Sequence, residues 1–150
     1  MNKSAIVKAT LVAGTLDILF AIVMTLKSGG DILAMLRGVA AGPFGDATQD
    51  WGVAGSIAGL LVHFAMMAIM AAALAVLLRQ PRVASMNWIV VGILYGLATY
   101  LVMYGIVLPL RFGSHFPQTD PARIASALFA HVGLVGLLMT WIFRRTPQRA

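Results

Sequence analysis

The chain has no cysteine and very few charged residues. Only 11% of its 150 residues are charged, whereas roughly a quarter are charged in a soluble globular domain. The absence of cysteine excludes disulfides, thiolate metal sites and iron–sulfur clusters. Hydrophobic residues make up 60% of the chain. This composition excludes an ordinary soluble domain and indicates a membrane protein.

Several functional signatures are missing as well. The sequence has no nucleophile motif, no phosphate-binding loop and no paired carboxylates of the kind that catalyse hydrolysis. The formal net charge is +6, yet no basic patch interleaved with aromatic residues is present, so nucleic acid is not an expected partner. The basic residues instead flank apolar segments, as in membrane proteins. We therefore expect a protein without catalytic activity of its own whose main partner is the lipid bilayer.

Long apolar runs are the dominant feature of the sequence. The longest, residues 51–78, contains no formal charge, and about 20 residues suffice to cross a bilayer as a helix. In the first run, Asp17 interrupts the apolar stretch and no small-x-small cleavage site follows before Lys27, so we interpret it as an uncleaved span rather than a secretory signal. We predict an all-α integral membrane four-helix bundle, a single membrane domain over residues 1–150. The predicted spans are about residues 5–26, 51–78, 88–110 and 122–143.

A shorter helix is predicted in the connection between the first two spans. Glycines and Pro43 bound it, and Asp31 is placed to cap its N-terminus. At about ten residues it is too short to cross a membrane. We expect an interfacial or re-entrant helix, which lies in the interface or enters the mouth of the bundle.

The distribution of Lys and Arg predicts the orientation. Four spans place both termini and the 79–87 link on one side, which carries seven cations and no acid, against four cations and four acids on the other. Because cytoplasmic loops are enriched in Lys and Arg, both termini are expected in the cytoplasm and the protein in a bacterial inner membrane. The seven cations are Lys3, Lys8, Arg79, Arg82, Arg144, Arg145 and Arg149, and the four are Lys27, Arg37, Arg111 and Arg123.

Two glycine pairs predict close helix packing. Gly55 and Gly59 lie four residues apart in the second span, and Gly92 and Gly96 do so in the third. Small residues at this spacing share one helix face and let backbones approach. His63 continues the Gly55–Gly59 stripe one turn further, so we expect it to point at other helices rather than at lipid.

Asp17, His63 and His131 form the candidate polar centre, with Tyr100 as an additional hydroxyl. At about 1.5 Å per residue, all three ionisable groups lie roughly 15 to 18 Å into the membrane, near its midplane. Unpaired ionisable groups at this depth cost about 2.5 to 3.5 kcal/mol or more. An interior contact between Asp17 and a histidine is therefore physically attractive.

Three interpretations of this centre remain open. In the first interpretation, the centre belongs to a non-catalytic membrane protein and is either a structural hydrogen-bonded network or a small binding site. In the second, it is the proton-coupled centre of a small-solute transporter that acts as a dimer. In the third interpretation His63 and His131 bind haem or a transition metal, while under the other two no cofactor is expected. The methionines after His63 are interpreted as flexible packing rather than a copper path.

Several short motifs together resemble a family of small four-span bacterial membrane proteins of the YagU-like kind. They comprise residues 13–18, His63-Phe64, Tyr95-Gly96, Tyr100, Met103, residues 107–110, His131 with Gly133, and Arg144-Arg145. The resemblance covers most of the chain. It implies the four-span topology and draws attention to Asp17, His63 and His131, but it brings no known activity.

Overall fold

The computed structural model describes residues 3–147, and every regular element in that range is a helix. Its elements form four long helical runs, with α2 (Ile32–Phe44) between the first two and α4 (Pro81–Ala84) between the second and third. The runs are α1 (Lys3–Lys27), η1 with α3 (Asp46–Trp51, Gly52–Leu77), α5 with η2 and α6 (Trp88–Val102, Met103–Val107, Leu108–Phe112), and α7 with η3 and α8 (Pro121–Leu128, Phe129–Leu137, Leu138–Arg145). The predicted all-α fold class, with a short helix between the first two spans, is confirmed.

All four runs are long and apolar enough to cross a membrane, with mean hydropathies between 1.8 and 2.5. Much of their outer surface is apolar and exposed: Leu61 is 67% and Ile69 is 69% exposed. Such a surface on a helical bundle suits lipid, which needs no polar partners. The chain is thus a multi-pass helical membrane protein in contact with the bilayer.

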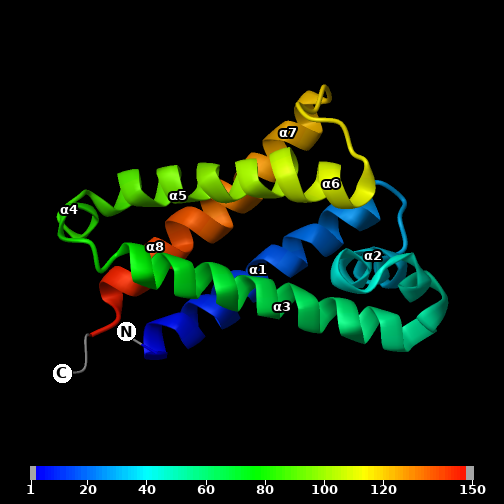
Figure 1. Cartoon of the computed structure of the whole chain (residues 1–150), viewed down its shortest axis with the longest axis horizontal. Helices are drawn as coiled ribbons and strands as arrows, with labels where there is room; N and C mark the ends of the chain where they lie inside the picture. The colour runs from blue at the N-terminus through cyan, green and yellow to red at the C-terminus, as the bar shows by residue number, and fades with distance from the viewer. Residues whose placement is uncertain (1–2, 148–150) are drawn as a thin grey trace.

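The two ends of the bundle differ (Figure 1). Both chain ends and α4 lie at one end, which we call the terminal end, while α2 and α6 lie at the other, which we call the α2 end. This arrangement agrees with the four-span count, in which the termini share a side. Of the cations used to predict orientation, Arg149 lies outside the described residues.

A seam of alanines packs the terminal end. Ala5, Ala9 and Ala13 are completely buried and recur every four residues along α1, so they form one face of that helix. This face belongs to a core that includes Leu74 of α3 and Met139 of α8. Because alanine brings helix backbones close, van der Waals packing holds the helices together here.

The short helix α2 enters the bundle and packs against α3. The carboxylate of Asp31 caps it by accepting from the Ala34 N–H at 2.6 Å. A hydrogen bond joins α2 to α3: the Ser56 hydroxyl of α3 donates to the Leu33 carbonyl of α2 at 2.9 Å. Gly59 is the closest point, because a Cβ added there would overlap the backbone of Leu36. The glycine stripe of the second span thus meets α2 rather than another span.

The third and fourth runs make a similar glycine contact. A Cβ on Gly96 would lie 2.5 Å from the His131 carbonyl oxygen, and one on Gly92 would lie 2.9 Å from the Leu137 Cα. Gly136 faces Gly92 across the same junction. The backbones of α5 and η3 are therefore in direct contact. The contact at Gly96 sets the position of His131 along α5.

Two π-helical segments interrupt the α-helices. They are η2 in the third run and η3 in the fourth. Proline often ends or kinks a helix, yet the third run continues through Pro109 to Phe112, directly after the wide turn η2. Such wide turns are frequently found at functional sites.

Candidate functional site

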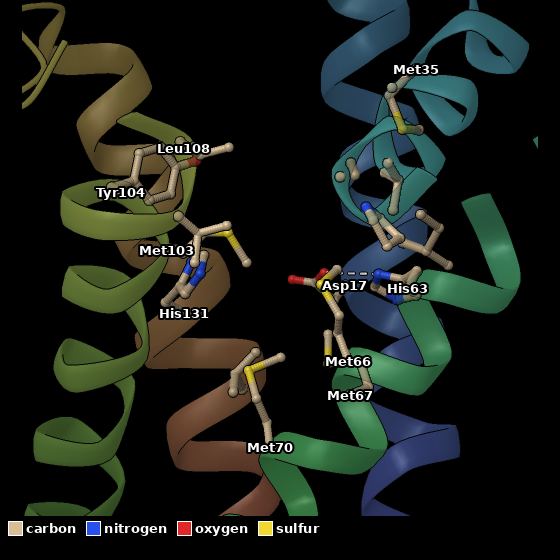
Figure 2. Close-up of a pocket in the computed structure, with 18 of the residues that line it drawn as sticks. Asp17, Met35, His63, Met66, Met67, Met70, Met103, Tyr104, Leu108 and His131 are labelled. Atoms are coloured by element: carbon tan, nitrogen blue, oxygen red, sulfur yellow. Dashed lines mark ion pairs between the residues drawn. The ribbon is translucent and has the colours of Figure 1, made fainter. Parts of the chain in front are cut away.

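A cavity of about 470 Å³ lies within the bundle, between its two halves. One wall comes from α1, α2 and α3, and the other from η2, α6 and η3. Figure 2 shows Asp17 and His63 on one side of this space, and Met103, Tyr104 and His131 on the opposite side. The polar candidates thus come from both halves and border one volume.

Asp17 and His63 form an ion-pair contact on the first wall. His63 Nδ1 lies 4.0 Å from Asp17 Oδ2. The His63 side chain is 7% exposed and the Asp17 side chain is 20% exposed. The other ring nitrogen, Nε2, lies 2.9 Å from the Gly14 carbonyl oxygen. Because a carbonyl only accepts, Nε2 carries a hydrogen and donates it. This bond fixes the imidazole with Nδ1 toward Asp17.

His131 presents its imidazole on the opposite wall. Its Nδ1 lies 3.0 Å from the Ala127 carbonyl oxygen and donates to it, so Nε2 is the ring nitrogen left for a ligand. The ring sits edge-on to Tyr100 and Tyr104, with centroids 6.0 and 5.7 Å away. In Figure 2 the Asp17 side chain lies on the far side of the cavity from His131, next to His63. The two imidazoles, each held by a backbone carbonyl, therefore lie on opposite sides of the cavity.

Sulfur and small residues complete the walls. Five of the nine methionines line the cavity: Met35, Met66, Met67, Met70 and Met103. Thioether side chains are flexible and polarizable, so they adapt to apolar ligands of different shapes. From α2, Gly38 and Gly42 also face the cavity, and a Cβ at either would meet nothing within 4 Å. Free volume therefore extends up to the α2 backbone.

Hydrogen bonds between the halves bracket the cavity. Toward the terminal end, the Tyr95 hydroxyl of α5 donates to the Met70 carbonyl at 2.7 Å. Toward the α2 end, Arg111 Nε donates to the carbonyls of Ala41 and Gly42 at 3.0 and 3.1 Å, and its Nη2 donates to Asp46 Oδ1 at 2.7 Å. The Arg111 side chain thus connects α6 to the C-terminal end of α2 by hydrogen bonds.

The predicted site residues occupy different positions around this cavity. Asp17, His63 and His131 all line it, whereas Tyr100 is buried behind the wall, stacked on Tyr104 with centroids 4.9 Å apart. Tyr104 lines the cavity and was not among the predicted residues. Its membership in the wide turn η2 is a structural signal that sequence periodicity does not carry.

The haem hypothesis requires two imidazole nitrogens aimed at one metal. In the structure His63 uses Nε2 to bond Gly14 and directs Nδ1 at Asp17, which leaves His131 Nε2 as the uncommitted nitrogen of the pair. Among residues 3–147, no group of three or more His, Cys, Asp or Glu side chains is arranged to hold a metal ion. In this arrangement the two histidines do not direct two free ring nitrogens at one metal.

No family model matches the chain, and no curated protein and no solved structure matches it at a significant level. The resemblance to the YagU-like proteins stays a prediction.

Proposed function

We propose that the polar centre is a small binding site, in which a compact and largely apolar molecule occupies the cavity within the membrane. The observation that carries this proposal is the position of Asp17 and His131, which border a shared space from opposite walls instead of bonding to each other. A structural network would place such groups in direct hydrogen bonds, because unsatisfied buried polar groups are costly.

The shape and chemistry of the cavity support the same proposal. Ligand sites are mostly apolar pockets of about 300 to 1,000 Å³ with a few convergent polar groups. This cavity has that size, a thioether-rich surface and four titratable side chains, Asp17, His63, Tyr104 and His131. Its polar groups would fix the orientation of a ligand, while the methionines would adapt to its apolar part.

Methyl-labelled methionine provides a direct test. Titrating the purified protein in nanodiscs with tert-butylbenzene and with phenyltrimethylammonium is expected to shift the NMR signals of the five cavity methionine methyls. Met24, Met86 and Met139 do not line the cavity, so their signals are expected to stay in place. Unchanged cavity signals with both probes would contradict the proposed site.

A cavity-filling variant supplies the matched control. Gly38→Phe is expected to abolish the ligand-dependent shifts, because its ring would enter the free volume and its Cβ meets no atom within 4 Å. Helix α2 is expected to tolerate the change, since glycine is a poor helix former. Leu33→Phe, at an exposed position of the same helix, is expected to leave ligand binding unchanged.

We further propose that both termini face the cytoplasm of a bacterial inner membrane, from the excess of cations at the terminal end. A fluorescent protein fused after Ala150 is then expected to fluoresce, and alkaline phosphatase fused there is expected to be inactive. Active phosphatase at this position would reverse the proposed orientation.

A proton-coupled small-solute carrier that acts as a dimer is the second candidate. The observation in its favour is the Asp17–His63 pair, which borders a cavity between the two halves of the bundle. Hydrogen bonds from Tyr95 and Arg111 join these halves at the two ends of the cavity. It requires transport in addition to binding. Uptake by sealed vesicles containing the protein would distinguish a carrier from a binding protein.

A further inference from the structure

We infer that the ligand is a lipophilic monocation, and that its binding displaces one proton from the Asp17–His63 pair. This inference rests on the proposed function and adds to it the charge of the ligand and the stoichiometry of an exchange. Its basis is the distribution of charge around the cavity and the bonding of His63.

The cavity has an acid but no fixed cation on its walls. Asp17 is the one carboxylate among its lining residues within the described chain, and none of those residues is Lys or Arg. Of the two arginines near the cavity's α2 end, Arg111 is committed to two carbonyls and to Asp46, and Arg37 of α2 is not among the lining residues. Because the walls carry a carboxylate and no Lys or Arg, they attract a positively charged ligand more than a negatively charged one.

The opposite wall also suits a cation. Tyr104 of η2 lines it with an aromatic ring, and His131, whose Nδ1 donates to Ala127, would in its neutral form offer the lone pair of Nε2. Aromatic rings and thioethers attract a poorly hydrated organic cation without requiring hydrogen-bond donors from it. A monocation at the centre would thus contact Asp17 on one side and the Tyr104 ring on the other.

The geometry of His63 defines where the exchanged proton resides. Since Nε2 donates to Gly14, Nδ1 is the nitrogen that faces the carboxylate, 4.0 Å from Oδ2. With one proton between them, the pair is either a carboxylic acid with neutral imidazole or a carboxylate with imidazolium. Both forms carry no net charge.

Charge balance then requires the exchange. If a monocation entered while the proton stayed, the site would hold one uncompensated positive charge away from water, which is costly. If the proton leaves to solvent, the carboxylate balances the cation and the imidazole is neutral, so the net charge is again zero. The other titratable groups on the walls, His131 and Tyr104, keep their protonation states in this scheme.

Two probes that differ in one atom test the inference. Phenyltrimethylammonium and tert-butylbenzene have the same shape, with a charged nitrogen in one and a carbon in the other. The full chain in nanodiscs, in weakly buffered solution with a pH-indicator dye, is expected to release about one proton for each phenyltrimethylammonium bound, at some pH near neutrality. Tert-butylbenzene is expected to shift the cavity methionine signals without releasing a proton.

Variants at Asp17 locate the effect. Asp17→Asn is expected to weaken phenyltrimethylammonium binding on the order of 30-fold or more, as for removal of a buried charge partner, and to abolish proton release. Its retained binding of tert-butylbenzene would show that the cavity is still formed. Asp17→Glu keeps the carboxylate and is expected to retain both cation binding and proton release.

The outcomes separate the two proposals. Equal binding of both probes, an undiminished affinity of Asp17→Asn for the cation, or cation binding without proton release at every pH tested would overturn the inference and leave the binding site standing. If neither probe shifts the cavity methionines, the proposed function itself fails, and the inference with it.

Discussion

Replacing Gly59 with leucine is expected to prevent stable assembly of the bundle. A Cβ at this position overlaps the carbonyl of Leu36 in α2, and that obstacle is backbone rather than a flexible side chain. Helix α2 would have to move away from α3 and lose its bond from Ser56 to Leu33. Overpacking usually costs about 1 to 3 kcal/mol and occasionally more, so a loss of about 3 kcal/mol or more is expected in the free energy of unfolding measured in detergent.

Two controls isolate the effect of backbone contact. Leu60→Ala changes a neighbouring, exposed residue and is expected to alter stability within about 0.5 kcal/mol. Gly38→Ala also adds a methyl group to a helical glycine, but this methyl meets no atom within 4 Å, so stability is expected to be unchanged or to increase. Equal unfolding free energies for all three variants would show that Gly59 does not touch α2.

Asp17→Asn and His63→Ala are each expected to destabilise the bundle, and the double variant is expected to lose less than the sum. The single losses are expected to be about 1 to 3 kcal/mol, because each removes a partner from a buried polar group. The shortfall reflects the contact between Asp17 and Nδ1, which is already lost in either single variant. The measurement is a double-mutant cycle of unfolding free energies.

Asn87→Ala provides the reference pair for this cycle. Asn87 caps α5 in the link at the terminal end, where its side chain accepts from the Ile89 N–H, and it shares no partner with Asp17. Losses from Asp17→Asn and Asn87→Ala are expected to add. If the losses of Asp17→Asn and His63→Ala also add, the two residues do not share a network.

Much of the fold could be predicted because hydrocarbon imposes strong constraints on sequence. The uncharged run at residues 51–78 corresponds to α3 at Gly52–Leu77, and the run at residues 5–26 corresponds to α1 at Lys3–Lys27. Asp31 caps α2, as its position before that helix predicts. These features depend on local composition and on capping residues, and both can be read directly from a single sequence.

The partners of the glycines could not be predicted in the same way. The spacing of Gly55 and Gly59 indicates a face that admits another backbone, but not which backbone it is. In the structure that backbone belongs to the short helix α2, which consequently lines the cavity with Met35 and Gly38. Which segment fills a groove depends on the whole bundle rather than on the local pattern.

The choice between the two tyrosines shows another limit. A helical wheel advances by a constant angle per residue, so it places Tyr100 and Tyr104 on nearby faces. The wide turn η2 begins at Met103 and changes that angle, and Tyr104 rather than Tyr100 reaches the cavity. The other three predicted polar residues, Asp17, His63 and His131, do line the cavity.

The alanine seam of α1 limits how this sequence can diverge. Ala5, Ala9 and Ala13 have no exposed surface, so a larger side chain at any of them would separate α1 from its neighbours. Leu11 and Leu19, by contrast, are at least half exposed on the lipid side, and Ile, Val or Phe would serve there as well. Selection for this architecture therefore acts most strongly on its smallest side chains, while the bulky residues that make the chain hydrophobic are free to drift.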